Sequence, residues 1–119
     1  FNDTWGHQIG DRVLKKVAEI TAATVREGID LPARYGGEEF TVIMPNTPLE
    51  GAVHLAERIR NNVEQTILMH EDKPISVTIS LGCATFPDHA ADKEALIKTA
   101  DEALYRSKQA GRNRTTAAA

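Results

Sequence analysis

The stretch "RYGGEEFTVIMP", residues 34–45, decides how this chain is expected to fold. Its paired glycines, Gly36 and Gly37, suit the positive φ angles of a tight turn, and a run of apolar and β-branched residues follows them. The stretch therefore predicts a β-hairpin. Its strands are expected at residues 33–35 and 38–44, with the two glycines at the tip.

Two glutamates, Glu38 and Glu39, stand beside this turn. Neighbouring side chains of a strand point to opposite faces, so the two carboxylates are expected to have different roles. The bare glycines allow a ligand to approach closely, and carboxylates are hard ligands that suit Mg²⁺ when substrate phosphates complete the site. The alternative is that both are solvated surface charges. The hairpin residues alone leave the two interpretations open.

An amphipathic helix is predicted before the hairpin, from Gly10 to Glu27. Asp11 is expected in its first turn, and Gly28 follows its end. The apolar positions recur at helical spacing, and they are Val13, Leu14, Val17, Ile20, Thr21 and Val25.

A second helix is predicted after the hairpin. Thr47 is expected as its N-cap, Pro48 as its first residue and Glu50 as the partner in a capping box, and it should end near Gln65. Its inward face is expected to consist of Leu49, Ala52, Val53, Ala56, Ile59 and Val63.

The remaining segments predict one strand and one helix. Residues 75–85 alternate apolar and small polar side chains, which indicates a strand, and residues 69–74 before it are expected to be a polar connection. A third helix is predicted from 92 to 110, with Gly111 as its C-cap. Its inward residues are expected to be Leu96, Ile97, Ala100, Ala103 and Leu104.

The order helix, hairpin, helix, strand, helix favours a single α+β domain, with helices laid on a mainly antiparallel sheet. Three strands would make a thin sheet, which fits a missing upstream strand. Residues 115–119 carry no pattern and are expected to be a tail or a cloning scar.

Composition narrows the class of protein. The chain has 119 residues and a net charge of −3, which argues against nonspecific nucleic-acid binding, and no apolar run is long enough to span a membrane. The single cysteine, Cys83, is in phase with the apolar face of its strand and is expected to be a buried, inert thiol in a reducing cytoplasm. The four histidines lack metal-ligand spacing, so each is expected to be a surface or capping residue.

Four blocks in this order and spacing, "FNDTWGHQIGD", "RYGGEEF", "VTISLGCA" and "ADEALYRSKQAGRNR", resemble the GGDEF family of diguanylate cyclases. The resemblance covers nearly the whole chain. It implies a partial GGDEF domain at residues 1–114, with the ferredoxin-like, adenylyl-cyclase-like fold of that family lacking its first strand.

The resemblance implies that two GTP molecules are joined into cyclic di-GMP with release of two pyrophosphates. Each domain of a twofold homodimer would hold one GTP, with two Mg²⁺ or Mn²⁺ ions per active site. Glu39 matches the signature carboxylate that binds metal, and Glu38 matches the residue that assists metal binding or deprotonates the ribose 3′-hydroxyl. Phe40 completes the signature "GGEEF".

The resemblance also assigns substrate contacts. Asn2 and Asp11 match the pair that hydrogen-bonds the guanine edge, and Leu14 would pack against the base. Lys108 and Arg112 match the cations that hold the triphosphate. The alternatives are that Asp11 caps a helix, that Asn2 makes a turn, and that the two cations only complement a helix C-terminus.

Two features depart from the family. A first-strand aspartate that binds both metals is absent from the 119 residues, so this fragment is expected to have little or no cyclase activity. Asp30 matches the aspartate of the RxxD motif for product inhibition, but Glu27 occupies the arginine position and Arg26 is displaced by one residue. Primary inhibition is therefore expected to be weak or lost. Arg58 matches a secondary inhibitory arginine, although an exposed helical arginine needs no such role.

Two other classes of function remain as alternatives. One is a degenerate, non-catalytic module that binds GTP or cyclic di-GMP for regulation, and the other is a dimerisation scaffold. The resemblance also implies an upstream sensor or regulatory domain as a partner, while nucleic acid and direct membrane contact are not expected. The sequence does not fix whether the parent protein is anchored to a membrane.

Overall fold

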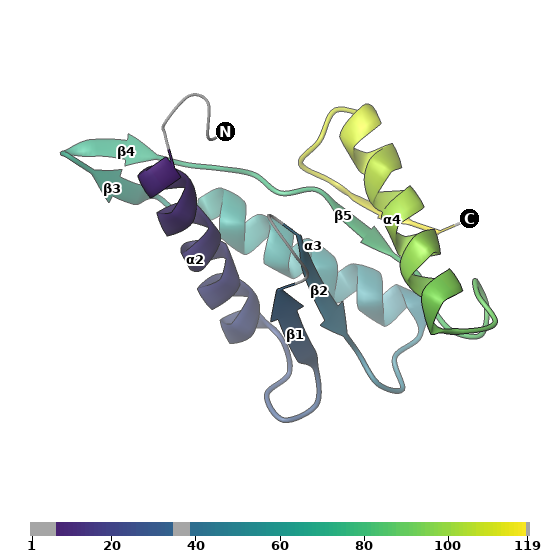
Figure 1. The fold of residues 1–119 in the computed structure, drawn as a ribbon. Helices are drawn as coiled ribbons and strands as arrows, with labels where there is room; N and C mark the ends of the chain where they lie inside the picture. The colour runs from purple at the N-terminus through teal and green to yellow at the C-terminus, as the bar shows by residue number, and fades with distance from the viewer. Residues whose placement is uncertain (1–6, 35–38, 119) are drawn as a thin grey trace.

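The computed structural model describes residues 7–34 and 39–118, and Figure 1 shows their arrangement. The elements in chain order are α2 (His7–Thr24), β1 (Leu31–Arg34), β2 (Phe40–Ile43), α3 (Leu49–Gln65), β3 (Leu68–His70), β4 (Lys73–Ile75), β5 (Leu81–Cys83), α4 (Lys93–Gln109) and β6 (Thr115–Ala117). The described strands form three two-stranded sheets, of which β1–β2 and β3–β4 are antiparallel and β5–β6 is parallel. The predicted α+β class, with helices around mainly antiparallel strands, is confirmed.

The core lies where α2 packs against α3. The apolar periodicity of both helices is confirmed, because the predicted positions supply most of their buried side chains. Each buried valine or isoleucine among them contributes about 1.5 to 3 kcal/mol by leaving water. Helix α2 begins earlier than predicted, at His7, and also ends earlier, at Thr24 rather than Glu27. Gly28, with a φ of 76°, lies four residues beyond its end. The buried cluster consists of Ile9, Val13, Val17, Val25, Leu55, Ile59, Val63 and Ile75.

The predicted hairpin is confirmed in the part that the structure describes. Strands β1 and β2 pair antiparallel, with Leu31 opposite Ile43 and Arg34 opposite Phe40. This register brings the last residue of β1 next to the first residue of β2. Gly36, Gly37 and Glu38 lie outside the described residues.

The predicted capping box at the start of α3 is wrong. The N-cap is Pro48, whose ring offers no hydrogen-bonding atom, and the helix begins at Leu49. The Thr47 hydroxyl instead donates to the carbonyl oxygen of Pro45, at 3.0 Å, and accepts from the guanidinium of Arg26, at 2.6 Å. The Thr47 side chain therefore contacts Arg26 instead of capping the helix, which is the role that the local sequence predicted. The predicted end of the helix at Gln65 is confirmed.

The expected polar connection at residues 69–74 is also wrong. It contains most of a second hairpin, in which β3 and β4 pair antiparallel around Glu71 and Asp72. Both turn residues have positive φ angles, 48° and 66°, which match the right-handed twist of a two-residue hairpin turn without glycine. The single strand predicted at 75–85 is confirmed only at Ile75 and at β5, and residues 76–80 lie outside any strand of the described chain.

Helix α4 packs on β5 and β6. Asp92 caps it, because its Oδ1 accepts a hydrogen bond from the amide of Ala95, at 2.8 Å. The approach to β5 is so close that a Cβ on Gly82 would lie 2.3 Å from the carbonyl oxygen of Ala100 and from the amide nitrogen of Leu104. Only glycine fits this crossing without movement of the backbone.

The expectation that residues 115–119 are a tail outside the fold is wrong as far as residue 118. Strand β6 pairs in parallel with β5, and Ala118 is 7% exposed. The fully buried Ser107 of α4 donates to the carbonyl oxygen of Leu81 on β5, at 2.7 Å, and shares a hydrogen bond with Thr116 on β6. Small alanine and threonine side chains give little periodic signal, so this strand is specified by its partners.

Candidate functional site

The carboxylate end of the candidate site lies where β2 begins. Glu39 is exposed and directly precedes the strand, while Phe40 is half-buried and packs against the core cluster. Phe40 thus anchors the signature to the core, and Glu39 is directed to solvent. Asn2, Gly36, Gly37 and Glu38 are also predicted site residues, and they lie outside the described residues.

The predicted guanine contacts lie on α2. Asp11 is exposed and Leu14, three residues later on the same side of the helix, is half-buried. Because α2 begins at His7, Asp11 lies beyond the first turn, and the expectation that it stands in the first turn or caps the helix is wrong. Its carboxylate is therefore available to solvent on the helix flank.

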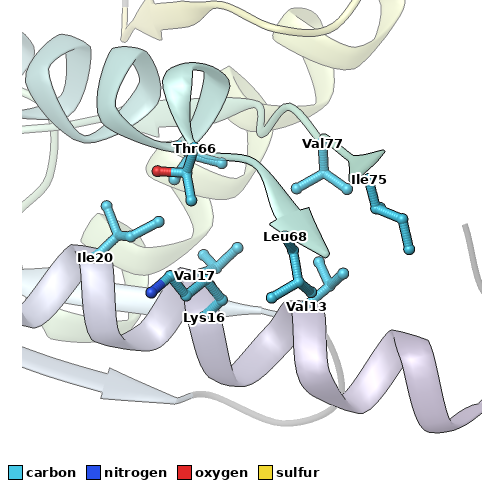
Figure 2. A pocket seen from close by; sticks show the side chains of 9 residues that line it. Val13, Lys16, Val17, Ile20, Thr66, Leu68, Ile75 and Val77 are labelled. Carbon is cyan, nitrogen blue, oxygen red and sulfur yellow. The ribbon is translucent and has the colours of Figure 1, made fainter. Parts of the chain in front are cut away.

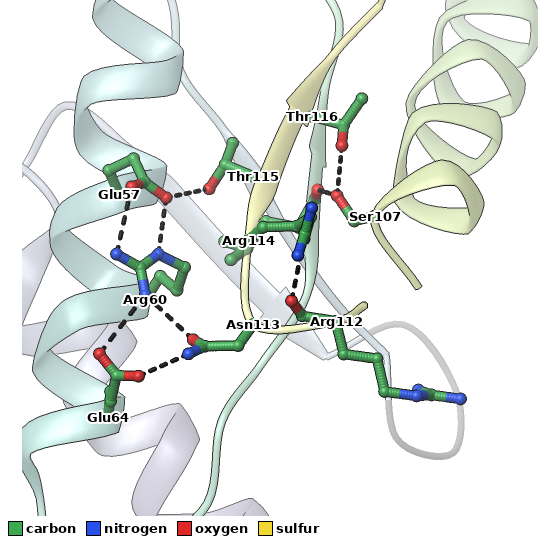
Figure 3. Close-up of polar contacts among 10 residues, drawn as sticks. Glu57, Arg60, Glu64, Ser107, Arg112, Asn113, Arg114, Thr115 and Thr116 are labelled. Atoms are coloured by element: carbon green, nitrogen blue, oxygen red, sulfur yellow. Dashed lines mark hydrogen bonds and ion pairs between the residues drawn. The ribbon is translucent and has the colours of Figure 1, made fainter. Parts of the chain in front are cut away.

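The predicted phosphate contacts lie at the end of α4. Lys108 is in the last turn of the helix, and Arg112 follows it in a tight turn; both are exposed. Three consecutive residues of this turn have positive φ angles, 122° at Gly111, 63° at Arg112 and 46° at Asn113. In Figure 3 the Arg112 side chain points away from the polar cluster that surrounds its neighbours. In Figure 1 this turn lies near the top, the N-terminal end of α2 lies at the left, and the start of β2 lies near the middle of the molecule.

The predicted inhibitory residues are arranged differently from the motif. Asp30 has a fully buried side chain, and both of its oxygens accept hydrogen bonds from Arg26, the shortest at 2.6 Å from Nη2. The Arg26 amide also donates to it, at 2.9 Å. Hydrogen bonding from the Arg26 side chain, opposed by burial, holds the pKa of Asp30 below its ordinary value. Glu27 and Arg58 are exposed.

A polar cluster that the sequence did not predict joins α3 to the turn after α4 (Figure 3). Arg60 lies between Glu57 and Glu64 on the helix and donates to the side-chain oxygen of Asn113, at 3.0 Å. Thr115 donates to Glu57, at 2.7 Å. The hydrogen bond from Arg60, and secondarily that from Thr115, lowers the pKa of Glu57. The i, i+3 and i, i+4 spacings of these residues on α3 are the sequence signal from which the ion pairs could have been predicted. The contact with Asn113 spans 53 residues and has no local sequence signal.

Cys83 takes the buried position predicted for it, whereas His70 and His89, expected to be surface or capping residues, are half-buried and hydrogen-bonded within the fold. Cys83 is 6% exposed, and burial raises its pKa to about 11, so the thiol is inert. His89 accepts from the amide of Thr85 through Nδ1, at 2.9 Å, within the turn that precedes α4. His70 accepts from Arg12 at 2.9 Å, which ties the β3–β4 hairpin to α2.

A small gap lies between α2, the end of α3 and the second hairpin (Figure 2). Its volume is about 20 Å³, and the side chains around it are almost all apolar, among them Val13, Val17 and Leu68. A space of this size and character accommodates no nucleotide, so it is a packing gap of the core. Within the described part of the chain, no helix is both long and apolar enough to cross a membrane.

Comparison with known proteins identifies the family of this chain. The family model described as "Diguanylate cyclase, GGDEF domain" matches residues 1–114. Diguanylate cyclase A of Treponema denticola is 47% identical over 116 residues, which cover 98% of this chain and 31% of the relative. The chain thus spans about a third of that protein.

Two solved structures share the fold. The GGDEF domain of DgcB from Caulobacter crescentus, in complex with cyclic di-GMP, superposes with a TM-score of 0.88 at 38% identity, covering 98% of this chain and 68% of that one. The active GGEEF domain of a diguanylate cyclase from Vibrio cholerae gives a TM-score of 0.83 at 30% identity, covering 99% and 74%. By its sequence and its fold, the chain belongs to the GGDEF family of diguanylate cyclases.

Proposed function

We propose that this domain catalyses the condensation of two GTP molecules into cyclic di-GMP and two pyrophosphates, with one GTP on each domain of a twofold homodimer. The observation that carries the proposal is the intact signature Gly36-Gly37-Glu38-Glu39-Phe40, flanked by strands whose register places Arg34 opposite Phe40. The same GGEEF form occurs in the solved Vibrio cholerae domain that is described as active. An upstream sensor or regulatory domain would control the reaction.

The hairpin carboxylates are proposed to hold divalent cations, two Mg²⁺ or Mn²⁺ per active site. The exposed Glu39 fits this role, because carboxylate oxygens are the ligands that these ions prefer. When bound, such ions would neutralise the triphosphates and favour loss of the 3′-hydroxyl proton. Glu38 would assist metal binding or accept that proton.

The remaining residues are proposed to bind and orient GTP. Asn2 and Asp11 would read the guanine edge, since a carboxylate accepts from the N1 and N2 protons that adenine lacks. Leu14 would pack against the base, and Lys108 and Arg112 would hold the triphosphate. Holding both nucleotides in place converts a bimolecular step into an effectively unimolecular one, and most of the rate enhancement is expected to come from this effect.

Cyclic di-GMP is proposed to inhibit this domain weakly through the RxxD position. The Asp30 carboxylate is already engaged by Arg26, and Glu27 would repel the phosphates of the dinucleotide. Arg58, exposed on α3, is the candidate for a secondary contact with the product.

The first experiment is chromatographic separation of nucleotides after incubation of GTP and Mg²⁺ with an N-terminally extended form that carries the first-strand aspartate of the family. Cyclic di-GMP should form, and it should be lost in Glu38→Ala and Glu39→Ala but retained in Glu50→Ala, which removes an exposed carboxylate from α3. The 119-residue chain should show little or no turnover. Unchanged GTP from a folded, dimeric extended form would instead favour the non-catalytic module that binds GTP or cyclic di-GMP.

A further inference from the structure

We propose that Asn113, held by Arg60 and Glu64 of α3, is a positioning residue that presents the Arg112 side chain to the GTP triphosphate. The inference rests on the proposed role of Arg112 in phosphate binding. It adds a function for the contact between α3 and the turn after α4, because Glu57, Arg60 and Glu64 lie outside the four sequence blocks that carry the family resemblance.

The turn after α4 requires external support. Arg112 and Asn113 have φ angles of 63° and 46°, a left-handed conformation that is unfavourable for side-chain-bearing residues, although asparagine tolerates it best. Gly111 precedes them with a φ of 122°. Such a run persists only where the surrounding structure holds it in place.

The support comes from α3 on one side (Figure 3). The Asn113 oxygen accepts from Nη1 of Arg60 at 3.0 Å, and its amide group donates to the Glu64 carboxylate. Glu57 binds the other edge of the Arg60 guanidinium through contacts of 2.7 and 3.2 Å. The Arg60 side chain is 18% exposed and those of Glu57 and Glu64 are 44% and 37% exposed, so solvent screens these contacts in part. Together the hydrogen bonds from Arg60 and to Glu64 set the position of the Asn113 side chain.

The backbone of Arg112 is held independently. Its amide donates to the carbonyl oxygen of Ser107 at 2.9 Å, and its own carbonyl oxygen accepts from Nε of Arg114 at 3.1 Å. Because Asn113 faces α3, the preceding Arg112 side chain is directed away from the cluster. The Arg112 guanidinium is therefore attached to an ordered backbone, which lowers the conformational entropy lost when it binds an anion.

The test is a calorimetric double-mutant cycle on Asn113 and Arg112, with GTP in Mg²⁺ as one probe and guanosine as the other, on the longest form of the protein that purifies folded. Asn113→Gly keeps the left-handed backbone accessible and removes the side-chain contacts. It should weaken GTP binding about tenfold, a difference of about 1.4 kcal/mol, and leave guanosine binding unchanged. In the Arg112→Ala background the same substitution should have no further effect.

The outcomes distinguish the positioning role of Asn113 from the phosphate-binding role of Arg112. The positioning role alone is overturned if Asn113→Gly binds GTP as tightly as the parent while Arg112→Ala binds it more weakly. It is also overturned if Asn113→Gly still lowers the affinity for GTP in the Arg112→Ala background. If the parent binds GTP no more tightly than guanosine, or Arg112→Ala binds GTP normally, the proposed phosphate role itself fails. Should Asn113→Gly unfold, Glu64→Gln replaces it, and faster hydrogen exchange of the Arg112 amide is expected in either variant.

Discussion

Arg26 and Asp30 form a closed pair, in which the guanidinium donates to both carboxylate oxygens and the Arg26 amide donates to the same side chain. The carboxylate is fully buried, whereas 44% of the arginine side chain is exposed. Arg26 also reaches Thr47, so one residue links the end of α2, the start of β1 and the loop before α3. The position that matches an inhibitory aspartate thus has a structural role in this chain.

The Arg26–Asp30 pair should make stability depend on pH. Hydrogen bonding lowers the folded-state pKa of Asp30, so its stabilisation is fully present above the ordinary value of 3.8 and is lost as the pH falls through the folded value. Urea unfolding of the parent should therefore show a larger loss of stability between pH 5 and pH 2.5 than unfolding of Asp30→Asn. Asp88→Asn, at an exposed carboxyl in the turn after β5, should behave as the parent does.

Binding of cyclic di-GMP should respond to residue 27. Replacing Glu27 with arginine removes a repulsive charge and adds a phosphate-binding guanidinium at an exposed position, so calorimetric titration should show tighter binding of the dinucleotide, by at least about tenfold. Glu19→Arg makes the same charge change on α2, away from this position, and should have a much smaller effect. Submicromolar binding by the parent that Asp30→Ala abolishes would contradict the proposal of a weak primary site.

Two glycine-to-alanine substitutions should have opposite effects on unfolding. At Gly82 the new Cβ would lie 2.3 Å from backbone atoms of α4, so Gly82→Ala should destabilise the fold by about 3 kcal/mol or more. At Gly51, within α3, the nearest atom is a side-chain methyl of Thr47 at 3.1 Å, and Gly51→Ala should range from neutral to about 1 kcal/mol stabilising. Denaturant melts of the two variants measure the difference. A neutral Gly82→Ala would show that α4 moves readily away from β5.

The thiol of Cys83 should be protected in the folded protein. With a pKa of about 11, it carries little thiolate at neutral pH. Labelling by iodoacetamide at pH 7.5 should be at least about 100-fold slower in buffer than in 8 M urea, where the pKa returns to about 8.5. Mass spectrometry at timed intervals measures both rates. Equal rates would show that β5 opens faster than the reagent reacts.

The guanine preference should depend on Asp11. Asp11→Asn replaces an acceptor pair with one acceptor and one donor, so the affinity for GTP should fall by about tenfold and the preference for GTP over ATP should narrow. Competition binding with both nucleotides measures the two effects. Glu19→Gln, on the same helix, is the matched control, and an unchanged preference in Asp11→Asn would remove this residue from the base site.

The sequence by itself determined the helices and the signature hairpin. Periodic apolar residues predicted the faces of α2 and α3, because these signals depend on neighbours within one or two turns. The predicted bounds of the last helix, 92 and 110, coincide with the two caps of α4, whereas the predicted C-cap Gly111 lies one residue beyond the observed C-cap, Ala110. The family motifs identified the candidate site for the same reason: each is a short local pattern. What that pattern could not show was that α2 begins at His7, which places Asp11 beyond the first turn of the helix.

Tertiary structure alone decided the contacts between distant segments. Thr47 hydrogen-bonds to Arg26, 21 residues earlier, instead of capping α3. Residues 115–118 belong to the fold because β6 pairs with β5 and the amide of Ala118 donates to the carbonyl oxygen of Cys83. Asn113 reached Arg60 across 53 residues. In each case a polar or small side chain has several local options of similar free energy, and the choice among them falls to whichever partner the packed helices bring within hydrogen-bonding distance.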